Sequence, residues 1–145
     1  MTTALATKSI QTATITLEAA VALVKAAQAA AKKIGFEAAI AVTDLAGNLK
    51  VFERADQCPL LAVEVAIDKA WTAASFGLGT HTWAEVIQNP RVSQLAHRPR
   101  LVAVGGGCPV MENGKVIGAI GVSGGNAEQD QRAAEIALQE VGFLI

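Results

Sequence analysis

The sequence contains no tyrosine, and aromatic residues make up only 4% of its 145 residues. Because single-stranded nucleic acids are held by stacking their bases on aromatic side chains, this shortage argues against that class of ligand. An excess of positive charge is also missing, since 12 Lys and Arg stand against 13 Asp and Glu and leave a formal charge of −1. The composition therefore argues against nucleic acids and anionic membrane surfaces as partners.

Cysteine is scarce as well, with Cys58 and Cys108 as the only two and no Cys-x-x-Cys pair. Two isolated cysteines do not form the disulfide framework of small secreted domains, so we expect unpaired thiols. No apolar run of about 18 residues could cross a bilayer. The first residues also lack the basic start and long apolar stretch of a signal peptide. We therefore expect a cytoplasmic protein.

Hydrophobic residues make up 52% of the chain, mostly as Ala, Val, Ile and Leu. A chain this apolar folds into a compact domain rather than staying disordered. So apolar a small chain needs a partner to cover the surface that its own fold leaves exposed. We therefore expect a homo-oligomer.

Hydrophobic periodicity and capping residues predict the order of helices and strands. Helices are expected over 17–34 (N-cap Thr16, closed by Gly35), 59–75 (Pro59 at its first position), 83–88 (capping box of Thr82 and Glu85) and 127–141 (capping box of Asn126 and Gln129). Strands are expected over 38–43, 49–54, 101–104, 108–111 and 115–122, and residues 1–15 form an arm or a short helix. The order predicts one α+β domain over 1–145, with an antiparallel five-stranded sheet and helices packed on it.

A glycine-rich corner, Ser123-Gly124-Gly125, joins the last predicted strand to the last predicted helix. Together with Gly121 it matches the Gly-x-Ser-x-Gly pattern of serine hydrolases, but both histidines precede Ser123, whereas that fold needs its histidine after the serine. The corner has two other interpretations. Unpaired backbone N–H groups at the helix start could cradle a carboxylate or phosphate, or the glycines could only relieve steric crowding.

Three more glycines, Gly105, Gly106 and Gly107, follow a predicted strand. They indicate either a sharp bend of the sheet or the close approach of a flat ligand or another backbone. Nearby, Arg98 and Arg100 flank a proline and could grip a carboxylate with paired hydrogen bonds, or they could simply be solvated.

The two histidines, His81 and His97, lie in the irregular region, and His81 has Trp83 beside it. Spacings such as His-x-x-x-His are absent, which argues against a zinc or non-haem iron site. On the long middle helix, Glu64, Asp68 and Thr72 form a polar stripe, with Lys69 beside Asp68. The stripe either faces solvent or lines a pocket.

Five segments carry a family resemblance: 41–48, 52–54, 67–74, 105–110, and 118–125 with Gln129-Asp130. With these segments in this order, from about Leu17 to Val141, the chain resembles the GlcG/HbpS-like haem-binding protein family, which includes the C-terminal domain of PduO-type proteins. The resemblance implies a profilin-like antiparallel sheet in an α/β/α sandwich, self-association into dimers or larger assemblies, and a setting in catabolic operons. In some members it also implies haem at or near a subunit interface.

Haem-binding members that ligate iron through a histidine in the N-terminal helical region have no counterpart here, because residues 1–35 contain no histidine. Haem in this chain would therefore use His81 or His97. The first functional hypothesis is a small-molecule-binding accessory protein for haem or another planar, carboxylate-bearing ligand. Arg98 and Arg100 would contact the carboxylates, and the glycine segments would allow close approach of the ligand.

The alternative is a cofactor-free enzyme, such as an isomerase, lyase or dehalogenase, acting on a small organic acid. His81 or His97 would be the general acid or base, Arg98 the carboxylate clamp, and Asp44 or Asp68 an orienting carboxylate. A purely structural oligomer is a third hypothesis. Both ligand hypotheses require the histidines and arginines to meet the Ser123–Gly125 corner in one cleft, within a chain or across a subunit contact.

Overall fold

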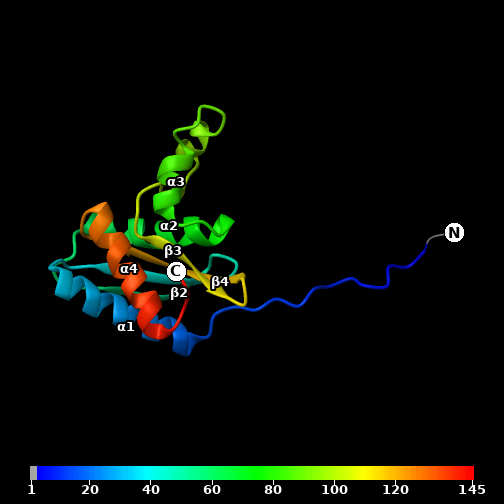
Figure 1. The fold of residues 1–145 in the computed structure, drawn as a ribbon, viewed down its shortest axis with the longest axis horizontal. Coiled ribbons are helices and arrows are strands. Elements are labelled where there is room, and N and C mark those ends of the chain that lie inside the picture. The colour runs from blue at the N-terminus through cyan, green and yellow to red at the C-terminus, as the bar shows by residue number, and fades with distance from the viewer. Residues whose placement is uncertain (1–2) are drawn as a thin grey trace.

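The computed structural model describes residues 3–145, which form four α-helices, one short 3-10 helix and one four-stranded antiparallel sheet (Figure 1). The elements in chain order are α1 (Leu17–Ile34), β1 (Ala39–Asp44), β2 (Leu49–Arg54), α2 (Leu60–Phe76), α3 (Thr80–Val86), η1 (Ser93–His97), β3 (Gly107–Glu112), β4 (Lys115–Ser123) and α4 (Ala127–Val141). The predicted α+β class is confirmed.

The sheet has the strand order β2-β1-β4-β3 and consists of two hairpins joined through β1 and β4. The turn between β3 and β4 is formed by Asn113 and Gly114, both with positive φ, as the Asn-Gly signal predicts. The β1 side chains alternate between the two faces, so Ile40 and Val42 enter one core and Ala39 and Ala41 the other. The continuous apolar run of this strand is therefore explained by burial on both faces.

Helices cover both faces of the sheet (Figure 1). The α1 and α4 helices pack side by side on one face, and α2 packs on the other. At Gly121 the approach of α2 to β4 is so close that a Cβ atom would overlap the carbonyl oxygen of Ala66. A glycine is therefore required where this helix crosses the strand.

The caps predicted at the ends of α1 and α4 are present. The Thr16 hydroxyl accepts a hydrogen bond from Ala19 N, and Gly35 ends α1 in the left-handed conformation. Asn126 and Gln129 form the expected capping box at the start of α4. Pro59 is the N-cap residue of α2, one position before the predicted place.

The capping box predicted for α3 is wrong. This helix begins earlier, at Thr80, so Thr82 lies inside its first turn and no side chain caps it. The Thr80 hydroxyl instead accepts a hydrogen bond from Gly107 N at 2.8 Å. This contact with the start of β3 holds the beginning of α3 at Thr80, two residues before the predicted cap Thr82.

The strand predicted over 101–104 is also wrong, and the described residues form four strands instead of five. This segment is fastened to α2, because the Thr72 hydroxyl donates to Arg100 O and accepts from Val102 N. A side chain therefore supplies the hydrogen bonds that a neighbouring strand would have supplied, and sheet pairing starts only at Gly107.

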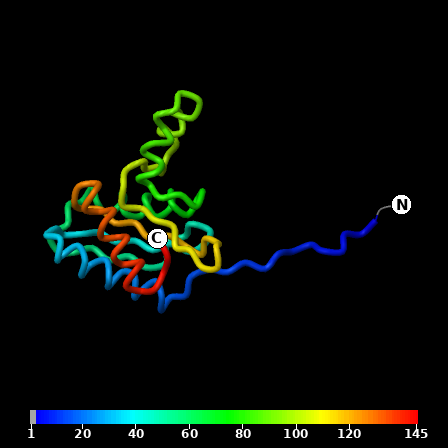
Figure 2. Tube along the Cα trace, in the orientation of Figure 1, coloured from blue at the N-terminus to red at the C-terminus, as the bar shows by residue number. Residues whose placement is uncertain are grey.

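Two parts of the chain project from the body (Figure 2). Residues 3–14 form an extended arm without helix or strand, on which Leu5 and Ile10 are exposed. The arm joins the body where Ile15 N donates to Ile117 O. The second projection consists of α3, η1 and the loop between them. Among residues 3–145, no helix combines the length and apolar character needed to span a membrane.

Candidate functional site

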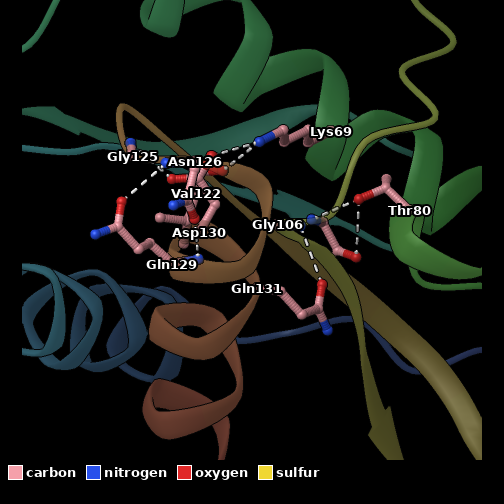
Figure 3. A network of polar contacts seen from close by, with 10 residues as sticks. Lys69, Thr80, Gly106, Val122, Gly125, Asn126, Gln129, Asp130 and Gln131 are labelled. Atoms are coloured by element: carbon pink, nitrogen blue, oxygen red, sulfur yellow. Dashed lines mark hydrogen bonds and ion pairs between the residues drawn. The ribbon is translucent and has the colours of Figure 1, made fainter. Parts of the chain in front are cut away.

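A buried ion pair links the two sides of the fold. Lys69 on α2 is 1% exposed, and its Nζ lies 2.8 Å from Asp130 Oδ2 on α4 and donates to Val122 O at 3.0 Å (Figure 3). Burial lowers the pKa of Lys69, while the hydrogen-bonded carboxylate of Asp130 acts in the opposite direction. Both partners are buried, since the Lys69 side chain is 2% exposed and the Asp130 side chain 3% exposed.

The backbone at the start of α4 is largely satisfied by its own side chains (Figure 3). Gly125 N donates to Asp130 Oδ1, and Asn126 N donates to Gln129 Oε1. Gln129 N in turn donates to Asn126 Oδ1. The expectation of unpaired N–H groups for an anion is therefore wrong for these three positions, because carboxylate and amide oxygens of the chain already occupy them.

The triple-glycine segment brings protein atoms together. Gly106 N donates to Gln131 Oε1 at 3.0 Å, and a Cβ at Gly106 would overlap Val122 O. At Gly107 a Cβ would lie 2.6 Å from Thr80 Cγ2. At these two positions the close approach that glycine allows is therefore to the chain itself. Gly105 also approaches the chain, since a Cβ there would lie 3.0 Å from Ala127 O, and it lines a shallow hollow beside His81.

Four of the predicted ligand-binding residues do meet in one place, which we call the Lys69 groove. The groove has a volume of about 360 Å³ and lies where the end of β4 meets α2 and the segment 102–104. Its lining consists of Pro59, Leu61, Ala62, Val65, Lys69, Val102, Val104, Ser123, Gly124, Gly125, Ala127 and Asp130.

A second groove, the His81 groove, lies between α3, β3, α4 and the C-terminus. It also measures about 360 Å³ and is lined by Gly79, His81, Cys108, Pro109, Met111, Gln131, Glu135, Leu138, Leu144 and Ile145. Gln131 Nε2 donates to Glu135 Oε1 at 2.8 Å and to Cys108 Sγ at 3.3 Å. Burial raises the pKa of Cys108 to about 12, so this thiol stays protonated at neutral pH.

His97 and Arg98 are not brought to either groove. Both lie on the projecting segment and line an exposed hollow with Arg91. Within one chain, the single cleft expected from the sequence is therefore divided among three separate places: this hollow, the His81 groove and the Lys69 groove.

Arg100 and Asp68 pair with each other. Arg100 Nε lies 2.9 Å from Asp68 Oδ1, and the guanidinium stacks over Trp71, with 4.8 Å from Cζ to the ring centroid. This pair holds the base of the projecting segment against α2.

The remaining two predicted residues also have contacts within the fold. Asp44 Oδ1 accepts hydrogen bonds from Ala46 N and Asn48 N in a turn. Trp83 is buried and packs against Phe76.

Sequence reasoning missed Asp130, Gln131 and Glu135 as site residues. A usable signal existed for the first of them. The buried residues of α4 follow helical spacing from Asp130 through Ala133, Ala134 and Ala137, so the aspartate occupies a core position of the helix. Lys69 likewise shares the buried stripe of α2. Opposite charges on two apolar stripes predict a buried ion pair.

The sequence matches the family model described as haem degrading protein HbpS-like over residues 15–139. The chain belongs to the HbpS-like family. The resemblance drawn from the motifs is thereby confirmed. A 15.0 kDa protein of Citrobacter freundii, encoded in the dhaT–dhaS intergenic region, is 43% identical to this HbpS-like protein over 135 residues, covering 90% of this chain and 94% of its own. Protein GlcG of Escherichia coli K12 is 36% identical over 102 residues, covering 70% and 75%.

Solved structures share the fold of this HbpS-like protein. Klebsiella pneumoniae protein ORFY superposes with a TM-score of 0.88 at 37% identity, covering 98% of this chain and 100% of ORFY. HbpS gives 0.87 at 30% identity, covering 97% and 99%. The haem complex of PduOC gives 0.82 at 28% identity, covering 90% and 97%.

Proposed function

We propose that this HbpS-like protein is an accessory protein that binds haem in the His81 groove, with His81 as the iron ligand. The observation that carries the proposal is the position of His81, one of only two histidines in the chain, in the wall of an apolar groove. A histidine is a common axial ligand of haem iron, and an apolar cleft suits a planar macrocycle. The haem complex of the similar PduOC structure supports the proposal.

The other side chains of the groove support the proposal. Met111, Leu138 and Leu144 supply apolar contact surface, and Gln131 and Glu135 form a polar side. The shallow hollow on the other side of His81 contains Arg132, whose guanidinium can pair with a carboxylate. Bound haem would supply a redox-active iron, and the chain's own part would be to hold and orient it.

His97 is the weaker candidate for the iron ligand. It lies in an exposed hollow with Arg91 and Arg98, on the segment that projects from the body. Three basic side chains around an open hollow suit a carboxylate better than an apolar macrocycle.

We also propose that the protein self-associates and that the subunit contact closes the His81 groove. Leu144 and Ile145 line this groove and are 82% and 69% exposed. Leu60, Leu61 and Phe76 are also exposed. Large exposed apolar side chains mark contact surfaces in soluble proteins. Light scattering on the purified protein should give a mass above 14.9 kDa, and a monomer with and without hemin would contradict this part.

The haem proposal is tested by titrating hemin into the wild-type protein and the variants His81→Ala and His97→Ala. We expect a saturable Soret shift for the wild type and for His97→Ala. For His81→Ala we expect affinity about tenfold weaker or lower and a changed spectrum, because the iron loses its ligand. His97→Ala is the matched control, since it removes the other imidazole. Equal binding by His81→Ala, or no Soret shift for the wild type, would overturn the proposal.

A further inference from the structure

The Lys69 groove contains a polar group that the fold does not use. Ser123 is 6% exposed, and its hydroxyl makes no hydrogen bond to any atom of residues 3–145. Because strand side chains alternate, Ser123 points to the same face as Gly121, which contacts α2. Among residues 3–145 the fully buried side-chain polar atoms without a partner are Thr43 Oγ1 and Trp83 Nε1, so the Ser123 oxygen keeps contact with the open groove. Its hydrogen-bonding capacity is available to a molecule in the groove.

A second donor lines the same groove. The Lys69 ammonium has three N–H groups, of which two bond Asp130 Oδ2 and Val122 O. Lys69 and Ser123 both line the groove, and Val122, whose carbonyl binds Lys69, immediately precedes Ser123 in the chain. Two donors that line one groove can together bind a single acceptor oxygen.

The rest of the groove is apolar. Leu61 and Val65 come from α2, and Val102 and Val104 come from the segment that follows Arg100. With a volume of about 360 Å³, the groove lies at the lower end of the range for small-molecule sites. An alkyl group of a few carbon atoms can therefore be covered by these walls.

The charge of the groove selects for a neutral molecule. Asp130 neutralises Lys69 and also accepts from Gly125 N, so the ammonium has no uncompensated charge to offer an anion. A carboxylate placed here would lose its hydration beside another carboxylate, which is unfavourable. A carbonyl oxygen loses much less hydration and offers two lone pairs to the two donors.

We propose that the Lys69 groove binds a small neutral carbonyl compound, an aldehyde or ketone. Its oxygen accepts hydrogen bonds from the Ser123 hydroxyl and the Lys69 ammonium, and its alkyl part contacts Val102 and Val104. The site is independent of haem binding, because the Lys69 groove and the His81 groove share no lining residue.

The test is a titration of ¹⁵N-labelled protein with butanone, followed through the amide signals of Ser123, Gly124 and Gly125. We expect saturable shifts of these signals in the wild type and about fivefold weaker binding in Ser123→Ala, the effect of one lost hydrogen bond. Ser75→Ala is the matched control. The Ser75 hydroxyl donates to Trp71 O on the exposed part of α2, outside the groove. Butyrate, of similar size but charged, should bind more weakly than butanone.

A second variant keeps the test independent of how Ser123→Ala folds. Val104 is half exposed, so Val104→Asp should leave the fold intact while placing a charge in the apolar wall and weakening butanone binding. The absence of saturable shifts in the wild type would overturn the proposal. Butanone binding as strong as that of the wild type in both Ser123→Ala and Val104→Asp would also overturn it. So would stronger binding of butyrate than of butanone.

Discussion

Lys69 and Asp130 are 61 positions apart in the sequence, yet their charged atoms lie 2.8 Å apart inside the protein. The contact joins the helix on one face of the sheet to the first turn of a helix on the other face. Because Asp130 also binds Gly125 N and Lys69 also binds Val122 O, the pair fixes the corner between β4 and α4. Both proposed grooves depend on α4 being held in this position.

Asp130→Asn should destabilise the protein by about 3 to 5 kcal/mol, because it leaves the buried ammonium of Lys69 without a counter-charge. Urea unfolding measures the effect as a lower midpoint at an unchanged slope. Glu128→Gln is the matched control, since it neutralises an exposed acid in the same helical turn. Two variants that unfold at the same midpoint would show that the pair contributes nothing to stability.

Asp68→Asn should cost no more than about 1 kcal/mol, because the Asp68–Arg100 pair is partly exposed, with side chains 27% and 44% accessible. The remaining effect should shrink in 1 M NaCl, where charges are screened over about 3 Å. Urea unfolding at low and high salt is the measurement. Glu64→Gln, one turn earlier on α2 and exposed, serves as control. A loss as large as that of Asp130→Asn would contradict this account.

Stability should fall at alkaline pH through Cys108. Its thiol has a pKa of 9.0 in the unfolded chain and about 12 in the folded protein. The unfolded state therefore loses its proton first, and the contribution present below pH 9 is lost progressively as the pH rises toward 12. Between pH 8 and 10 the wild type should lose about 1.4 kcal/mol more than Cys108→Ala. Parallel losses in urea unfolding at the two pH values would refute this prediction.

Gly121→Ala should destabilise the protein by about 3 kcal/mol or more, because the new methyl group would overlap the backbone of α2 at Ala66. Gly114→Ala is the comparison, since nothing lies near its Cβ position and only the positive φ opposes the change. That cost is about 1 kcal/mol. Thermal unfolding of both variants measures the difference, and a smaller effect at Gly121 would mean that α2 shifts away without loss of packing.

Most of the fold follows from local sequence signals. The caps of α1 and α4 and the Asn113-Gly114 turn were predictable because each depends on residues within four positions of one another. The cap of α3 and the strand over 101–104 were not, because Thr80 and Thr72 form hydrogen bonds with residues 27 and 28 positions away. A pattern within a short window does not contain such partners.

The candidate site shows the same division. The sequence by itself determined which chemical groups are available: two imidazoles, few arginines, and glycines at the ends of strands. Only the tertiary structure decided how they are grouped, since it separates His97 from His81, pairs Arg100 with Asp68, and buries Lys69 against Asp130. The physical reason is that hydrogen bonds, caps and helical periodicity act along the chain, whereas burial and charge pairing depend on which distant surfaces meet.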